Sequence, residues 1–330
     1  MEIAIIGAGS WGTALALLLT GKGHSVRLWS EEPDVVEDIR HNRENSKYLP
    51  GCVLSGSARA TGSMGESVEG TEAVVLAVPS GAVREVAGQL SDLTARTPLL
   101  VNAGKGLESE TGLRISQVLA EVLGEAAQAC VALSGPNLAV ELARQVPTAT
   151  VVASAEEGHA IAAQELFSSP CLRVYRSSDV AGVELGGALK NVLAIGAGIS
   201  DGLGYGDNTK AALVTRGLVE MMRLGEALGA QRRTFVGLAG VGDLVATCAS
   251  RLSRNLRVGL ALGHGMTTEQ ALAEVRQVAE GVPTCKAAYA LASSLGVYAP
   301  ITEQLYKVLF EGKSPRDAVA DLMLREPKEE

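Results

Sequence analysis

The sequence predicts an α/β domain with a parallel sheet, followed by an all-α domain. Three observations support this prediction. A glycine-rich turn, Gly7 to Gly12, lies between an apolar strand and an apolar helix at the start of the chain. Short apolar runs then recur at the spacing of βαβ units, and beyond about Ser178 the strand pattern gives way to helical segments. We therefore expect two domains, residues 1–178 and residues 179–330, each of ordinary size.

The first element is a buried strand, Glu2 to Ile6, and the turn Gly7-Ala8-Gly9-Ser10-Trp11-Gly12 follows it directly. A helix is expected from Thr13 to Leu19, and a second strand from Ser25 to Trp29. In this strand–turn–helix setting, G-x-G-x-x-G is typical of Rossmann-type dinucleotide-binding domains. The glycines permit a tight turn and close backbone approach, and the helix N-terminus receives a pyrophosphate. A glycine-rich βα turn without a ligand is the alternative.

Five further apolar runs continue the predicted sheet: Ala73 to Val78, Pro98 to Asn102, Cys130 to Ser134, Thr148 to Ala153 and Leu172 to Tyr175. Such near-continuous apolar strands are typical of a parallel sheet covered on both faces. Ligands of these sheets bind at the carboxyl ends of the strands, so residues just past each strand are candidate site residues. Lys105, between two glycines, is the strongest of them, because a flexible cation there suits a phosphate or a polarised oxygen. A solvent-facing loop lysine is the alternative.

The segment 182–217 is rich in glycine but has the pattern of a helix. Glycine inside a helix costs roughly 1 kcal/mol relative to alanine. Gly182, Gly186 and Gly187 therefore indicate close approach of a backbone, a cofactor or a substrate. The side chain of Lys190 would extend back over Gly186 and Gly187. A desolvated lysine at the floor of a cleft could donate or accept a proton; a surface lysine beside a tight helix crossing is the alternative.

Polar residues interrupt the predicted helices of the second domain at several later points. Arg254, between Ser253 and Asn255, offers planar donors to an oxyanion such as phosphate, although a solvated charge is the alternative. Asp243 follows Gly-Val-Gly and equally suits a turn or a helix N-cap. Taken together, the motifs and their spacing predict a two-domain dinucleotide-binding protein with a lysine-centred cleft. They do not identify a substrate.

Composition excludes several other classes of protein. The chain has 29 Lys and Arg against 37 Asp and Glu, a formal net charge of −8, and lacks a basic run, so nucleic acid is not an expected partner. The five cysteines are odd in number and scattered, which indicates reduced cysteines and neither disulfides nor a metal site. Without a signal peptide or a membrane-spanning apolar run, we expect a cytoplasmic protein that is not inserted in a membrane.

Seven segments along the chain carry a resemblance to a known family: GAGSWGTALA, AGKGLE, LSGPNLAVE, GVELGGALKNVLAIGAGISDGLGYGDNTKAALVTRG, GVGDLVATC, LSRN and VAEGVPT. With these segments in family order, the chain resembles the bacterial NAD(P)-dependent glycerol-3-phosphate dehydrogenases over nearly its whole length. The resemblance implies the reversible reduction of dihydroxyacetone phosphate to sn-glycerol 3-phosphate, which supplies glycerophospholipid synthesis. The helical domain is then the substrate domain. A homodimer is compatible with the sequence, which does not fix the oligomeric state.

Two other functions stay open at this point. β-Hydroxyacid and 6-phosphogluconate dehydrogenases also combine a dinucleotide domain with a helical domain and a catalytic lysine followed by asparagine, but they leave GDNTKAALVTRG and LSRN unexplained. A dinucleotide-sensing module without catalytic activity is the second alternative. The combination of Lys105, Lys190, Asp243 and Arg254 argues against a sensor, because a sensor needs no proton donor.

The resemblance also implies roles for individual residues. Lys190 would be the proton donor or acceptor for the reacting oxygen. The implied substrate contacts are Lys105, Gly135, Asn137, Lys190, Asp243, Ser253, Arg254 and Asn255. Together with the turn glycines Gly7, Gly9 and Gly12, the expected cofactor contacts are Ser10, Trp11, Glu31, Lys105, Ala139, Arg254, Val278 and Glu280. Asn137 departs from the family pattern, which has Ser or Thr there, and Glu31 stands where histidine is common.

Glu31 and Glu32 bear on the choice between NADH and NADPH. A carboxylate just past the second strand accepts hydrogen bonds from the ribose 2′-hydroxyl, whereas a 2′-phosphate requires a cation. The nearest basic residues are Arg27 in the strand and Arg40 in the next helix. We therefore predict NADH as the sole or preferred cofactor, although NADPH is usual in the family. The alternative is that the glutamates only begin a helix and an arginine still serves NADPH.

Overall fold

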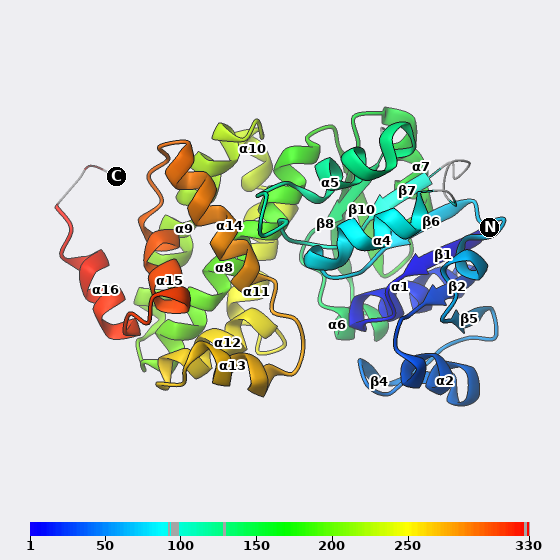
Figure 1. The fold of residues 1–330 in the computed structure, drawn as a ribbon, viewed down its shortest axis with the longest axis horizontal. Helices are drawn as coiled ribbons and strands as arrows, with labels where there is room; N and C mark the ends of the chain where they lie inside the picture. The colour runs from blue at the N-terminus through cyan, green and yellow to red at the C-terminus, as the bar shows by residue number, and fades with distance from the viewer. Residues whose placement is uncertain (92, 94–98, 128–129, 327–328, 330) are drawn as a thin grey trace. The chain divides into compact units, whose positions relative to one another are not determined.

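The structure is a computed structural model that describes residues 1–330 except 92, 94–98, 128–129, 327–328 and 330. The chain divides into two compact units, shown in Figure 1. The first unit comprises Met1–Lys105 and Arg114–Glu184, and the second comprises Gly106–Leu113 and Leu185–Glu330. The predicted division between residues 178 and 179 falls just before helix α8, Val180–Gly202, whose first five residues belong to the first unit.

An eight-stranded sheet forms the centre of the first unit, in the order β10-β9-β8-β7-β6-β1-β2-β5. Every residue of β6, β7 and β8 is buried, as expected for strands with helices on both faces. This sheet confirms the predicted α/β domain. Pro98, the expected first residue of one strand, lies outside the described residues. The strands of the sheet are β1 Glu2–Ile6, β2 Ser25–Trp29, β5 Ala58–Thr61, β6 Ala73–Leu76, β7 Leu99–Asn102, β8 Val131–Ser134, β9 Thr148–Ala153 and β10 Leu172–Ser177.

The prediction of a wholly parallel sheet is wrong at β8 and β9, which pair antiparallel with Ser134 opposite Val151. The connection between them contains only the five-residue helix α6, Ala139–Ala143. Such a helix rises about 7 Å, too little to return the chain to the amino end of β8 as a crossover helix does. The chain therefore enters β9 at the carboxyl end of β8. This reversal keeps residues 135–147 at the edge of the sheet where ligands bind.

Strand β5 and a small hairpin, β3 (Glu44–Asn45) with β4 (Leu49–Val53), were not expected from the sequence. Strand β5 is a four-residue edge strand with the sequence ARAT, and β4 contains Pro50 and Gly51, which are rare in strands. Helix α1 packs against α6 and α7, and α4 packs against α5. The other elements of this unit are α1 Ser10–Gly21, α2 Pro33–Asn42, α3 Met64–Val68, η1 Ser80–Ala82, α4 Val83–Leu90, α5 Ile115–Leu123, η2 Gly124–Ala127 and α7 Glu157–Phe167.

The second unit is helical, as predicted, and its central helix α8 is packed closely through glycines. A Cβ atom on Gly198 would lie 2.1 Å from the carbonyl oxygen of Leu256, and one on Gly259 would lie 2.0 Å from that of Ile195. Helices α8 and α12 therefore cross with their backbones in contact. The helices are α9 Asp207–Ala227, α10 Arg232–Phe235, the π-helical turn η3 Leu238–Gly242, α11 Asp243–Ala249, α12 Arg254–Gly263, α13 Thr268–Val275, α14 Gly281–Ser294, α15 Pro300–Phe310 and α16 Pro315–Met323.

By length and composition alone, α8 could cross a membrane, and so could the bent pair 232–249 and 254–263 if it formed one span. However, 89% of the most apolar stretch of α8 is buried inside the protein. Burial of this kind is what the core helix of a globular protein shows.

Candidate active site

The glycine turn has the geometry of a dinucleotide site. Gly7 adopts a φ of +113°, and a Cβ on it would lie 2.8 Å from the carbonyl of Ala77, just past β6. A Cβ on Gly12 would lie 1.9 Å from the carbonyl oxygen of Gly7, whereas the position above Gly9 is open. The first and third glycines thus close the turn, and the second leaves room for a ligand. This turn lies where the strand order reverses between β1 and β6, the usual place for a dinucleotide.

The start of α1 is also left available for an anion. Gly9 is its N-cap, so no side chain caps the first N–H groups, and the helix dipole favours negative charge there. The indole Nε1 of Trp11 is buried without a hydrogen-bond partner among the described residues. An orphaned buried donor beside an uncapped helix N-terminus is consistent with a bound polar ligand. Gly7, Gly9, Ser10, Trp11 and Gly12 therefore form a cradle that fits a pyrophosphate.

Glu31 lies past the carboxyl end of β2, in an exposed position, and it makes no hydrogen bond or ion pair with the described residues. The two arginines considered for a 2′-phosphate are engaged elsewhere. Arg27 Nη1 donates to the carbonyls of Glu66 and Glu69, at 3.0 and 2.6 Å. Arg40 Nε donates to the carbonyl of Ala60 at 2.9 Å.

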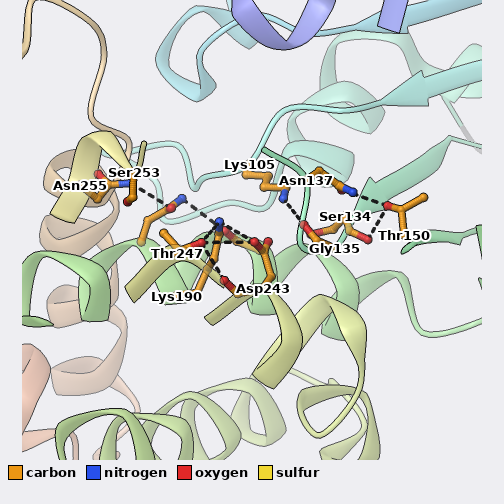
Figure 2. A network of polar contacts seen from close by, with 12 residues as sticks. Lys105, Ser134, Gly135, Asn137, Thr150, Lys190, Asp243, Thr247, Ser253 and Asn255 are labelled. Carbon is orange, nitrogen blue, oxygen red and sulfur yellow. Dashed lines mark hydrogen bonds and ion pairs between the residues drawn. The ribbon is translucent and has the colours of Figure 1, made fainter. Parts of the chain in front are cut away.

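Lys105 is held at the carboxyl end of β8 in the first unit. Its Nζ donates to the carbonyl of Gly135 at 2.8 Å (Figure 2). Gly135 has a φ of +154°, and a Cβ there would lie 3.0 Å from Cα of Thr150, so the antiparallel β9 packs directly against it. Ala139, the predicted cofactor contact, begins α6 in the same connection. The structure thus brings Lys105, Gly135 and Asn137 to one edge of the sheet.

Asn137 is anchored by Thr150, whose Oγ1 lies 3.0 Å from Asn137 Oδ1 and 3.0 Å from the carbonyl of Ser134 (Figure 2). The Ser134 hydroxyl is buried and lacks a partner among the described residues. It lies next to Gly135, where the resemblance implies a substrate contact. An unpaired buried hydroxyl at this edge fits a polar ligand. Thr150 was missed from the sequence, because only the unpredicted β8–β9 reversal brings it here. Ser134 was missed because it is the last residue of β8, and only residues past the strand ends were taken as candidates.

In the second unit, Lys190 lies in a buried polar cluster with Asp243 and Thr247. Its Nζ donates to Asp243 Oδ1 at 2.8 Å and to Thr247 Oγ1 at 2.7 Å (Figure 2). The Lys190 and Asp243 side chains are only 8% and 3% exposed, so the alternative of a surface lysine is wrong. Asp243 is the first residue of α11 and not its N-cap. The carboxylate neutralises the lysine charge and fixes the position of the ammonium group.

Glycine explains why Lys190 can reach this carboxylate. A Cβ on Gly186 would lie 2.4 Å from the carbonyl oxygen of Ala239 in η3, the turn that leads into Asp243. The backbones of α8 and η3 therefore touch one helical turn before Lys190. Thr247 was not among the predicted site residues, although it follows Asp243 by four positions and so shares its face of α11. Thr247 Oγ1 also lies 2.7 Å from the Asp243 carbonyl.

A second polar network joins α8, α12 and α14. Asn255 Nδ2 donates to Asn191 Oδ1, and Asn255 Oδ1 accepts from the Gly281 N–H, both at 2.9 Å. Ser253 caps α12, since its hydroxyl accepts from the Leu256 N–H at 3.2 Å. This network fixes Asn191, the residue after Lys190, relative to the start of α14. Asn191 was missed from the sequence, where nothing besides its adjacency to Lys190 marks it.

The remaining predicted residues of the second unit are nearer its surface. Arg254 is exposed at the start of α12, and Val278, 47% exposed, precedes α14 together with Glu280. The predicted contacts thus form two sets, one at the sheet edge and one around Lys190, each within its own unit. All five cysteines are free, and no cluster of three metal-ligating side chains occurs in the described part of the chain.

Comparison with known proteins gives a consistent match for both units. Residues 2–160 match the family described as NAD-dependent glycerol-3-phosphate dehydrogenase N-terminus, and residues 179–320 match its C-terminal counterpart. Glycerol-3-phosphate dehydrogenase (NAD(P)+) of Syntrophotalea carbinolica is 53% identical, over 100% of this chain and 99% of its own. The same enzyme of Citrifermentans bemidjiense is 52% identical, over 100% and 98%. The crystal structure of glycerol-3-phosphate dehydrogenase from Coxiella burnetii is 41% identical and has a TM-score of 0.95, with 98% and 99% of the two chains covered.

Proposed function

The chain belongs to the glycerol-3-phosphate dehydrogenase family, and we propose that it catalyses the reversible NAD(P)H-dependent reduction of dihydroxyacetone phosphate to sn-glycerol 3-phosphate. This product supplies glycerophospholipid synthesis. The observation that supports the proposal most directly is the buried ammonium group of Lys190, held by Asp243 and Thr247. Reduction of a ketone creates a negative oxygen, and a fixed proton donor is what that oxygen requires.

Each set of residues has a proposed part in this reaction. When bound, the nicotinamide cofactor would supply the hydride for reduction of the ketone carbon. Lys190 donates a proton to the ketone oxygen as charge develops on it, and accepts that proton in the reverse direction. Asp243 and Thr247 orient the Lys190 ammonium group and stabilise its charge. Lys105 and Arg254 supply positive charge for the oxyanion and the phosphate, with Gly135, Asn137, Ser253 and Asn255 as further substrate contacts.

Gly7, Gly9 and Gly12, with Ser10 and Trp11, are proposed to bind the cofactor pyrophosphate. Glu31, Ala139, Val278 and Glu280, with Lys105 and Arg254, are the other proposed cofactor contacts. We also propose NADH as the preferred cofactor. The unpaired Glu31 carboxylate supports this preference, because it suits a ribose hydroxyl and repels a 2′-phosphate.

A substrate panel tests the proposed reaction. NADH or NADPH oxidation is followed at matched concentrations of dihydroxyacetone phosphate, dihydroxyacetone and a β-keto acid. Reduction of NAD+ or NADP+ is followed with 6-phosphogluconate. We expect efficient turnover with dihydroxyacetone phosphate, slow turnover with dihydroxyacetone and none with the other substrates. Turnover with a β-keto acid instead would favour the β-hydroxyacid dehydrogenases, and turnover with none would favour a sensing module.

The cofactor preference has its own test. We expect the wild-type kcat/KM to be higher for NADH, and a Glu31→His, Glu32→Arg double variant to shift toward NADPH. A wild type that prefers NADPH by about tenfold or more, or a double variant whose preference does not move, would refute the preference and leave the reaction intact.

Cytoplasmic location is likewise part of the proposal. It is supported by the five free cysteines, which suit a reducing compartment, and by the burial of α8 within the protein. A homodimer stays a prediction, which sedimentation of the purified chain would test.

A further inference from the structure

Four side chains near the carboxyl end of β2 form a polar group that we call the Lys47 cluster: Glu32, Asp34, Lys47 and Tyr48. Lys47 Nζ forms an ion pair with Glu32 Oε2, and another with Asp34 Oδ2 at 3.0 Å. The Tyr48 hydroxyl donates to Glu32 Oε1 at 2.6 Å. Both carboxylate oxygens of Glu32 are therefore engaged by the turn of the β3–β4 hairpin, while Glu31 beside it is unpaired among the described residues.

The hairpin is fixed to the glycine turn by buried hydrogen bonds. Asn45, fully buried, donates from Nδ2 to the carbonyl of Ala8 at 2.7 Å and lies 2.8 Å from Thr13 Oγ1. Ser10 Oγ donates to the carbonyl of Tyr48 at 2.7 Å. Lys47 is thus positioned both by the hairpin's contacts with the glycine turn and by its ion pair with Glu32. In dinucleotide-binding domains this is the neighbourhood of the adenosine ribose and its 2′ position.

Lys47 differs from Arg27 and Arg40 in that its partners among the described residues are exposed carboxylates and not backbone carbonyls. The side chains of Lys47, Glu32 and Asp34 are 47%, 38% and 65% exposed. Exposed pairs of this kind stabilise a protein only weakly, so they do not lock the ammonium group. A phosphate monoester has a charge of about −1.5 to −2 and three acceptor oxygens, and it competes effectively with a carboxylate for a lysine. Arg27 and Arg40 instead donate to backbone carbonyls.

We propose that Lys47 is the cation that admits a 2′-phosphate, and that Glu32 and Asp34 determine the ratio of NADPH to NADH use by competing for its ammonium group. This inference rests on the proposed dehydrogenase function and deepens it. Glu31 discriminates directly at the ribose, whereas Glu32 acts through Lys47. Neither Lys47 nor its competition with a phosphate was expected from the sequence, where only the two arginines were considered.

The test uses Lys47→Met, Glu32→Gln and, as a matched control, Lys307→Met. Glutamine keeps an acceptor for the Tyr48 hydroxyl while removing one of the two negative charges that hold Lys47. Lys307 is a half-buried lysine that also has a carboxylate partner, Glu303, but it lies in α15 of the second unit. Two quantities are measured for each protein. One is the ratio of kcat/KM for NADPH to that for NADH, and the other is the Kd of 2′,5′-ADP relative to that of 5′-ADP.

We expect Lys47→Met to lower the NADPH to NADH ratio by roughly tenfold or more and to weaken 2′,5′-ADP selectively, as loss of one charge-assisted contact does. Glu32→Gln should raise the ratio, by about threefold or more, and Lys307→Met should leave it unchanged. Binding of 2′,5′-ADP that is no weaker in Lys47→Met than in the wild type would overturn the inference. Because that binding measurement needs no turnover, failure of the proposed reaction would be seen separately, as absent turnover with either cofactor.

Discussion

Replacing Lys190 with methionine tests whether its buried ion pair serves catalysis, stability or both. The substitution removes the ammonium group and leaves the Asp243 carboxylate, only 3% exposed, without its charged partner. Removing one member of a buried pair costs about 3–5 kcal/mol of stability, because the remaining charge is desolvated and unpaired. Turnover should fall by about 10²–10⁴-fold, the usual effect of losing a general acid. Lys190→Arg should not restore it, because arginine does not release a proton near neutral pH.

A double-mutant cycle separates the two effects. Lys190→Met combined with Asp243→Asn removes both charges, and should recover most of the lost stability without recovering turnover. The free energy of unfolding is measured by urea denaturation, and kcat by oxidation of NADH with dihydroxyacetone phosphate. Turnover that returns together with stability in the double variant would refute the reasoning, since it would assign the loss in Lys190→Met to misfolding.

Two further predictions concern Arg254 and Glu220. Arg254→Ala should raise the KM for dihydroxyacetone phosphate far more than that for dihydroxyacetone, because a charge-assisted contact to the phosphate is lost; equal losses in steady-state assays would show that Arg254 does not contact the phosphate. Glu220 in α9 accepts from the Ile301 and Thr302 N–H groups at the start of α15, and its burial raises the pKa of its carboxyl to about 7. Because the folded state holds this proton more tightly, the stability of the wild type relative to Glu220→Gln should fall by up to about 3 kcal/mol as the pH rises from 4.5 to 7. A pH-independent difference in urea denaturation would contradict the assignment.

The first unit could be predicted from the sequence wherever local pattern decides structure. The strand Glu2–Ile6 and the glycine turn after it combine burial, turn chemistry and helix start in one short stretch, so their prediction is confirmed. The antiparallel β8–β9 pair could not be predicted, because strand direction depends on how far a short connection reaches. The β3–β4 hairpin was missed because β4 contains Pro50 and Gly51, which are unfavourable in strands. The hairpin is stabilised instead by tertiary contacts, such as the hydrogen bond of Asn45 to Ala8.

The candidate site divides in the same way. Lys190 could be singled out because the glycines before it require a physical reason, and contact of α8 with η3 at Gly186 is that reason. Its partner Asp243 looked equally like a turn residue, since pairing across 53 positions leaves no local pattern. Lys47 was missed for a similar reason: its neighbours in sequence do not reveal that a hairpin brings it to Glu32.

Chemical rescue of Lys190→Ala tests the central claim most directly, namely that the Lys190 ammonium group is the proton donor. Alanine leaves a space beside Asp243 and Thr247, which a small alkylammonium ion such as methylammonium can enter. We expect oxidation of NADH with dihydroxyacetone phosphate to be nearly abolished in this variant and to rise in proportion to added methylammonium, with no such rise in the wild type. Near-wild-type turnover of Lys190→Ala without any added amine would contradict the claim.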